Sequence, residues 1–179
     1  PVRLVTLGRL VLEKSQSVMV KAVYEMAMRN LSASLTIIGS GPLEPSLSRL
    51  IHQLNLADSV FLLGFQENPY EWLAQADFFI LTSLWESLSL ALMEAMALGL
   101  PAIATATGGT PELITHLENG YLIPPNSPQA LADAVEYLSY HPDVAHQMGE
   151  KAQKHIFDHY TIPKIADQLE NYYLRLLQQ

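Results

Sequence analysis

Six short apolar runs alternate with helical patterns along the chain, and this alternation is the feature that most constrains its fold. The runs cover residues 4–7, 35–38, 60–63, 78–81, 102–104 and 121–123. Most are continuously apolar, as is typical of parallel strands that are covered on both faces. The sequence therefore predicts a doubly wound, Rossmann-like α/β domain, with a parallel sheet of about six strands and helices on both faces.

Helical patterns occupy the stretches between and after these runs. Three of them repeat apolar residues on one helical face. The residues are Leu43, Leu47, Leu50, Ile51 and Leu54; Leu131, Ala134, Val135 and Leu138; and Ile165, Leu169, Tyr172, Tyr173 and Leu176. A proline-rich turn leads into the second of these helices, with Ser127 as the expected N-cap. The third pattern predicts an amphipathic helix over residues 162–177.

The composition limits the class of protein. The chain has 179 residues, of which 49% are hydrophobic and 16% charged, and this predicts one globular domain over residues 1–179. A net charge of −8 argues against a nucleic-acid partner and a basic membrane-surface module. The lack of cysteine excludes a disulfide scaffold and thiolate sites. No apolar run approaches the roughly 18 residues of a membrane span. The start at Pro1 suggests a piece of a longer protein.

Positive charge is confined to the two ends of the chain. No lysine or arginine occurs between Leu50 and Glu150, so an anionic ligand depends on helix N-termini, backbone amides or the early basic residues. Arg9 directly follows the first predicted strand, and Lys14 comes five residues later. We expect both at the carboxyl end of the sheet, where doubly wound folds bind ligands. The alternative is that both are solvated loop charges.

Glycines follow several of the predicted strands. They are Gly8, Gly39, Gly41, Gly64 and the pair Gly108 and Gly109. Glycine at such places permits a positive φ and lets a ligand approach the backbone closely. The alternative explanation is the ordinary preference of turns for glycine.

The segment from Trp85 to Gly99 is the most informative one. After Ser89 its helical pattern is apolar on every side except at Glu94, which predicts a buried helix with Glu94 in or beside the core. A carboxylate there needs hydrogen-bond donors, and no lysine or arginine is near it in sequence. The two hydroxyls of a ligand diol suit its two oxygens. The alternative is a glutamate that caps or pairs within the fold.

Glu86 lies eight residues before Glu94, where a loop meets the same predicted helix. Ser87 and Ser89 leave hydroxyl and backbone N–H groups at the positive end of this helix. Such an end can seat a phosphate without a lysine. Glu86 would then face whatever group the phosphate carries.

Eight short motifs, in one order, connect these residues with a known family. The motifs are Gly8-Arg9-Leu10 with Lys14; residues 38–42; residues 61–64; Ala76-Asp77; Glu86 and Glu94 with seven residues between them; residues 99–101; residues 108–112; and Asn119-Gly120. Across nearly its whole length the chain resembles the C-terminal, donor-binding half of glycosyltransferase family 4, the retaining enzymes of the GT-B fold. The resemblance implies that an N-terminal, acceptor-binding domain is absent from this chain.

The resemblance also implies a reaction and its catalytic residues. It implies a hexosyltransferase-type enzyme that transfers a sugar, with retention, from a nucleotide-sugar to an acceptor. Arg9 and Lys14 would neutralise the diphosphate of the donor, and Glu86 would contact hydroxyls of the donor sugar. Glu94 would bind the ribose.

Further donor-binding candidates follow from the same resemblance. They are Gly8, Gly64, Phe65, Ser87, Leu88, Ser89 and Leu90. The base would pack near Gly64 and Phe65, and backbone amides of residues 87–90 would seat the phosphate. Many members have glycine where this chain has Ser87 and Ser89, and often where it has Ser15 after the lysine. These departures bear on the identity of the donor.

Metal-dependent transferases hold a divalent ion with an Asp-x-Asp pair, which this chain lacks. The resemblance therefore implies no metal and no cofactor, since the nucleotide-sugar is a substrate and protein cations replace the metal. The six histidines show no ligand spacing and are interpreted as surface residues. They are His52, His116, His141, His146, His155 and His159. Such an enzyme is expected in the cytoplasm, or at the membrane through its absent half.

Two other functions fit the same residues. Another GT-B enzyme, such as a nucleotide-sugar epimerase or a sugar-phosphate synthase, would share the donor half. A non-catalytic nucleotide-binding module would share the fold, although a degenerate module is expected to have lost Glu94 or the pair Arg9 and Lys14. By itself the chain is expected to bind a donor without transferring its sugar. Its final helix is expected to pack against, or cross toward, the absent half.

Overall fold

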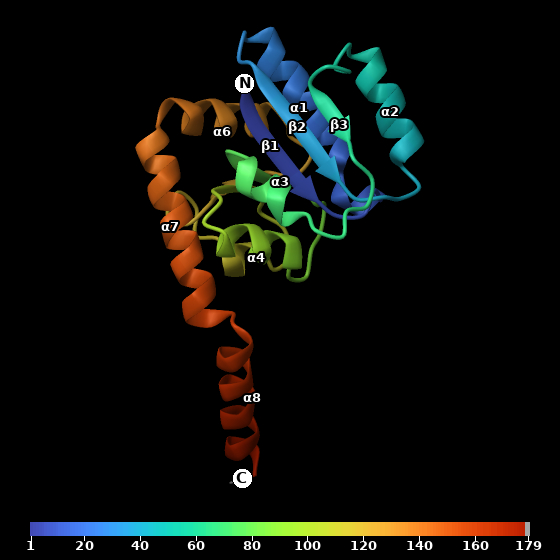
Figure 1. The fold of residues 1–179 in the computed structure, drawn as a ribbon. Coiled ribbons are helices and arrows are strands. Elements are labelled where there is room, and N and C mark those ends of the chain that lie inside the picture. The colour runs from blue at the N-terminus through green and yellow to red at the C-terminus, as the bar shows by residue number, and fades with distance from the viewer. Residues whose placement is uncertain (178–179) are drawn as a thin grey trace.

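The computed structural model describes residues 1–177, which form a six-stranded parallel sheet with helices on both faces (Figure 1). The strands are β1 (Val2–Leu7), β2 (Ala33–Ile38), β3 (Val60–Leu62), β4 (Phe78–Leu81), β5 (Ala102–Thr105) and β6 (Tyr121–Ile123). Each predicted apolar run forms one of these strands. The predicted doubly wound, Rossmann-like α/β fold is therefore confirmed.

The strand order is β3-β2-β1-β4-β5-β6, so the chain starts at the centre of the sheet and builds outward in both directions. The order reverses between β1 and β4, where Leu4 pairs with Phe78 and Val5 with Phe79. In doubly wound folds the connections diverge to opposite faces at such a reversal, and ligands bind beyond the carboxyl ends of the two strands. The loops that follow Leu7 and Leu81 are therefore where a site is expected.

Helices cover both faces of the sheet and create two separate cores. The helices are α1 (Gln16–Met28), α2 (Glu44–Gln53), α3 (Tyr70–Gln75), α4 (Leu90–Ala97), α5 (Thr110–Leu113), α6 (Pro128–Tyr140), α7 (Pro142–His159) and α8 (Ile162–Leu176), with a short 3₁₀ helix η1 (Leu12–Lys14). Phe78 and Ile80 of β4 enter the core closed by α1, α2 and α6. Phe79 and Leu81 enter the core closed by α3, α4, α5 and α7. Burial on both faces explains why β4 is continuously apolar.

Helix α4 differs from its prediction. Leu92, Ala95 and Met96 are buried, but Leu90 is 72% and Leu98 46% exposed. The prediction of a helix buried on every side is therefore wrong in part. The reason is that β4, β5 and α7 pack against only one side of this helix, and the other side faces solvent in the described part of the chain.

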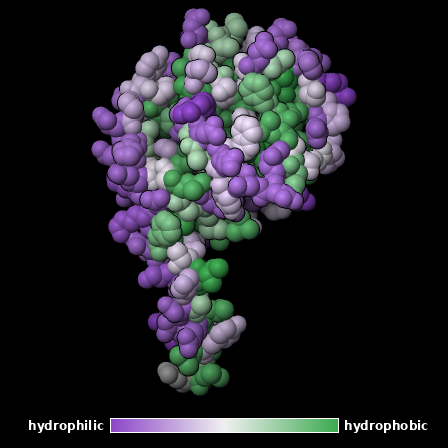
Figure 2. Space-filling model, viewed as in Figure 1, coloured by the Kyte–Doolittle hydropathy of each residue, from purple (hydrophilic) through white to green (hydrophobic). Residues whose placement is uncertain are grey.

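The two predicted helical patterns nearest the C-terminus are both confirmed but differ in packing. Helix α6 packs on α1, and Ser127 caps it, since its Oγ accepts a hydrogen bond from Ala130 N at 3.2 Å. Helix α8 has no buried residue and projects from the body (Figure 1). Figure 2 shows hydrophobic side chains at the surface of this projecting helix. Within residues 1–177, no helix is both long and apolar enough to cross a membrane.

Candidate functional site

The loops after β1 and β4 are bonded to each other at the carboxyl edge of the sheet. Leu84 N donates to Glu13 O at 2.7 Å. The hydroxyl of Thr82 lies 3.2 Å from Lys14 O and 3.0 Å from Ser15 O, and it is buried. These contacts fix the backbone that carries Lys14 against the start of the loop that carries Glu86. Two segments that are remote in sequence thus form one rigid edge.

Lys14 and Glu86 form an ion pair at this edge. They are 72 residues apart in sequence, and the Lys14 ammonium bonds to Oε2 of Glu86. Their side chains are only 20% and 14% exposed. The aliphatic part of the Lys14 side chain lies over Gly8, since a Cβ added at Gly8 would lie 3.8 Å from Lys14 Cε. The structure therefore brings three candidate residues together: Gly8 and Lys14, which follow β1, and Glu86, which follows β4.

Arg9 lies outside this ion pair. Its side chain is 77% exposed, and the nearest carboxylate is that of Glu13, 3.8 Å away. An exposed pair at that distance contributes little to stability, so the Arg9 guanidinium is available to an anion at the mouth of the site. Gln16 holds the backbone of this loop, since its Nε2 donates to Arg9 O at 2.8 Å.

Glu94 is half-buried on α4, beside the core as predicted. Within residues 1–177, its carboxylate has no hydrogen-bond or ion-pair partner. Helix α4 is capped instead by Ser89, whose Oγ accepts a hydrogen bond from Leu92 N at 3.3 Å. The carboxylate of Glu94 therefore retains its full capacity to accept hydrogen bonds from a ligand.

Four of the predicted glycines serve the packing of one loop on another. A Cβ added at Gly108 would overlap Glu86 O, and one added at Gly109 would overlap Ser87 O. Gly109 N also donates to Glu86 O at 2.9 Å, which seats the segment that carries the glutamate. A Cβ added at Gly39 would likewise overlap Gly8 O, and one added at Gly41 would overlap the backbone of Leu10. Close packing of protein backbone therefore accounts for glycine at these four positions without a ligand.

Gly64 is different, since nothing lies within 4 Å of a Cβ added there. Its φ of +68° favours glycine, and its carbonyl accepts a hydrogen bond from Gly39 N at 2.8 Å. Phe65 beside it is exposed, as are Leu88 and Leu90 on the loop before and at the start of α4. The loop after β3 therefore presents open backbone and an apolar side chain, and the loop before α4 presents apolar side chains of its own.

Ser15 has a φ of +50°, in the left-handed region that favours glycine. It follows Lys14 and precedes the first residue of α1. This geometry is a physical reason for a glycine at that position, and the chain tolerates serine there with some backbone strain. Ser87 is exposed and Ser89 is buried, so the two serines of the next loop have different surroundings.

Ser83 is a site residue that the sequence analysis did not identify. It is fully buried, and its Oγ donates to Oε2 of Glu86 at 3.1 Å. Its position two residues after the end of β4 and three residues before Glu86 is the one signal in the sequence that points to it. That signal is weak, because serine is common wherever a strand meets a loop.

Metal-ligating residues do not gather in the described part of the chain. Within residues 1–177, no three His, Cys, Asp or Glu side chains are placed to hold a metal ion. Five of the histidines are exposed, as predicted, and His155 is half-buried. Burial and the charge of His159 lower the pKa of His155. Metal-independence of the reaction stays a prediction.

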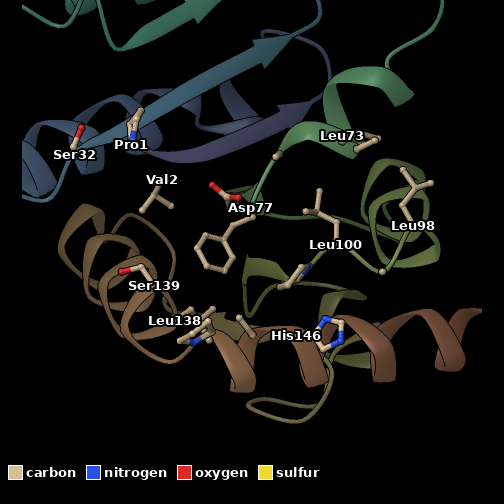
Figure 3. Close-up of a pocket in the computed structure, with 17 residues that line it drawn as sticks. Pro1, Val2, Ser32, Leu73, Asp77, Leu98, Leu100, Leu138, Ser139 and His146 are labelled. Carbon is tan, nitrogen blue, oxygen red and sulfur yellow. The ribbon is translucent and has the colours of Figure 1, made fainter.

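A large groove lies elsewhere, at the amino ends of β1, β4 and β5 (Figure 3). Its volume is about 850 Å³. The lining includes Val2, Leu73, Asp77, Leu100, Leu138 and His146. None of the candidate site residues lines it. Uncommitted polar groups lie at the carboxyl edge, so we locate the candidate site there.

Comparisons with known proteins agree with this fold. The family model "Glycosyl transferases group 1" matches residues 1–155. N-acetyl-alpha-D-glucosaminyl L-malate synthase of Bacillus anthracis is 36% identical over 148 residues, which are 83% of this chain and 39% of that protein. The chain therefore spans less than half the length of that relative.

Solved structures have the same architecture. Anabaena Alr3699/HepE, crystallised in complex with UDP, matches with a TM-score of 0.89 at 23% identity, over 97% of this chain and 48% of that one. The C-terminal domain of LpcC, a glycosyl transferase group 1 family protein from Francisella tularensis, matches with a TM-score of 0.80 at 25% identity. That match covers 90% of this chain and 87% of that domain. The chain therefore belongs to the glycosyl transferases group 1 family and has the fold of the C-terminal domain of a GT-B enzyme.

Proposed function

We propose that this chain is the donor-binding half of a retaining glycosyltransferase that transfers a hexose from a nucleoside diphosphate sugar. The observation that carries the proposal is the arrangement at the β1–β4 reversal. There the Lys14–Glu86 ion pair and the exposed Arg9 lie in the loops that follow β1 and β4. Glu94, which has no partner within residues 1–177, lies on α4, the helix that begins where the second of these loops ends. A chain with this fold and no such groups would be a plain α/β module. The UDP bound to Anabaena Alr3699/HepE supports a ligand of this class.

Each group has a role that its chemistry suits. Arg9 and Lys14 carry the positive charge that a diphosphate needs, and the amides at the start of α4 add the positive end of a helix. Glu94 accepts hydrogen bonds from the two ribose hydroxyls, since its oxygens have no protein partner. Glu86 accepts a hydrogen bond from a hydroxyl of the donor sugar. The base packs on the open backbone at Gly64 and on Phe65.

The difficult step of the reaction is departure of the nucleoside diphosphate from the anomeric carbon. Cations and helix amides that are already in place stabilise the negative charge that develops on the leaving group. Lys14 is held by Glu86 before the donor arrives, so it needs little reorganisation. In this proposal protein cations do the work of a divalent metal, and the reaction takes place in the cytoplasm.

The acceptor site belongs to a second domain in this proposal. The chain covers 39% of the Bacillus anthracis relative and 48% of Alr3699/HepE, so each has further chain of comparable length. Helix α8 exposes an apolar stripe that includes Ile165, Leu169 and Tyr172, and a facing domain would cover it. Transfer requires donor and acceptor within near-attack distance, so this chain alone binds the donor without transferring its sugar.

Calorimetry of the chain with UDP, GDP and ADP tests the proposal. We expect one of the three to bind with a dissociation constant on the order of a millimolar, because only half of a closed cleft is present. Glu94→Ala should weaken that binding about tenfold, since it removes two charge-assisted hydrogen bonds. Glu150→Ala, which removes an exposed carboxylate of α7, is the matched control and should bind like the unchanged chain. Equal binding by the Glu94→Ala and Glu150→Ala variants would contradict the ribose role.

A further inference from the structure

Ser83 is a buried residue that contacts Glu86 on one side and the residues at the end of β5 on the other. It lies two residues after the end of β4, its side chain is fully buried, and its hydroxyl has one proton to donate. That proton goes to Oε2 of Glu86, 3.1 Å away. No role for this residue follows from the family motifs quoted above, since Ser83 lies between the Ala76-Asp77 motif and the motif of Glu86 and Glu94.

The backbone of Ser83 is held on its other side by the end of β5 and the residues after it. Thr105 Oγ1 donates to Ser83 O at 2.6 Å, and Thr107 Oγ1 donates to the same oxygen at 3.1 Å. Thr105 is itself fully buried. The carbonyl of Ser83 is therefore held by two hydroxyls of the neighbouring segment, and its side chain is fully buried, whereas the side chain of Glu86 is partly exposed. The hydrogen bond between them restricts the glutamate rather than the serine.

The same carboxylate oxygen is bonded twice. Oε2 of Glu86 accepts from Ser83 Oγ and from the Lys14 ammonium, and Oε1 has no partner within residues 1–177. The terminal torsion of a glutamate is broad when nothing holds the carboxylate. Two donors on one oxygen restrict the orientation of the carboxylate plane, and they leave the other oxygen able to accept a hydrogen bond from a ligand.

We propose that Ser83 is a positioning residue for Glu86, because its buried hydroxyl fixes Oε2 and so presents Oε1 to a hydroxyl of the donor sugar. This inference rests on the proposed function, since it assigns Glu86 to the sugar rather than to the diphosphate. It separates two contributions to donor binding. Loss of the Ser83 hydroxyl weakens recognition of the sugar and leaves recognition of the nucleoside diphosphate unchanged.

The experiment compares dissociation constants for UDP, GDP and ADP with those for the glucose ester of the nucleotide that binds. The measured quantity is the dissociation constant of the nucleoside diphosphate divided by that of its glucose ester. This ratio isolates the contribution of the sugar, and it falls when recognition of the sugar is weakened. Ser83→Ala should reduce this ratio about fivefold, toward the value for Glu86→Ala, with no change for the nucleoside diphosphate alone. Ser83→Cys keeps the shape with a weak donor and should give a smaller reduction in the same direction.

Thr107→Val is the matched control. It removes another hydroxyl bonded to Ser83, but at the carbonyl oxygen rather than at Glu86. We expect the ratio to be unchanged in this variant. An equal loss in Thr107→Val and Ser83→Ala would overturn the inference, because a general loosening of the loop would then explain both. An unchanged ratio in both serine variants, with both ligands bound, would also overturn it. Failure of every nucleotide to bind the unchanged chain would instead overturn the proposed function.

Discussion

The two ends of the sheet differ in what their polar groups already bond to. At the amino end, the groove of about 850 Å³ is the larger feature, and its carboxylate, Asp77, is fully engaged. Asp77 accepts from Arg3 N at 2.7 Å, from Nε at 3.2 Å and from Nη2 at 2.7 Å. At the carboxyl end, Glu94 and one oxygen of Glu86 have no partner within residues 1–177, and Arg9 extends into solvent.

This difference shows that volume alone is a poor guide to a binding site. A groove whose carboxylate is already paired can offer a ligand apolar contact and polar groups such as Ser32 and Ser139, but no free carboxylate. Charged and polar groups without internal partners are costly to retain near a core, and a ligand that pairs with them recovers that cost. Three predictions test this comparison, beginning with the largest expected effect.

Gly109→Ala should destabilise the carboxyl end most. Its Cβ would overlap Ser87 O, and its φ of −81° means that the effect is steric rather than conformational. We expect a loss of about 2 kcal/mol in the free energy of unfolding, and weaker nucleotide binding because Glu86 and Ser87 must shift. Gly8→Ala is the control for stability, since its Cβ would make only ordinary contact with Lys14, at 3.8 Å. Equal stabilities in denaturant unfolding would contradict the packing of the two loops.

Removing Arg9 should affect anionic ligands specifically. We expect Arg9→Ala to weaken binding of the nucleoside diphosphate about five- to tenfold and to leave binding of the nucleoside unchanged, as measured by calorimetry. Added salt should reduce binding to the unchanged chain in the same way, because the guanidinium is exposed and screened. Arg49→Ala removes an exposed arginine of α2 and is the matched control. Equal losses for nucleoside and diphosphate would indicate a folding defect.

Arg3→Ala should have the smallest effect, confined to the amino end. Burial by itself would raise the pKa of Asp77, but the hydrogen bonds and charge of Arg3 bring that pKa below its ordinary value of 3.8. A lowered pKa in the folded state stabilises the fold above the unfolded value, and this stabilisation is lost as the pH falls through the folded value. The stability difference between Arg3→Ala and the unchanged chain should therefore be present at pH 7 and disappear below pH 3.8.

The measurement for Arg3→Ala is denaturant unfolding across that pH range. Nucleotide binding at pH 7 should be the same in the variant and the unchanged chain, because the site is at the other end of the sheet. A stability difference that persists at the acid end would show that Arg3 acts through packing rather than through Asp77.

The strands, their parallel arrangement and the place of Arg9 and Lys14 in the loop after β1 were predictable from the sequence. That these two residues, Glu86 and Glu94 bind one ligand stays a prediction. Continuous apolar runs indicate strands that are buried on both faces of a sheet. The order of the motifs indicates the family and therefore its fold. The Lys14–Glu86 pair and the hydroxyl of Ser83 were not predictable, because hydrogen bonds between loops far apart in sequence leave no periodic pattern. The exposed side of α4 was missed because an apolar pattern does not reveal how many neighbours cover a helix.

Amide NMR of the chain during titration with UDP, GDP and ADP tests the central claim most directly. The account predicts that the nucleotide that binds shifts the amides of Gly8, Arg9, Lys14, Glu86 and Glu94, at the carboxyl ends of β1 and β4. The amides of Val2, Asp77, Leu100 and His146, around the groove in Figure 3, should stay unchanged. Shifts confined to the groove, with the carboxyl edge unperturbed, would contradict the account.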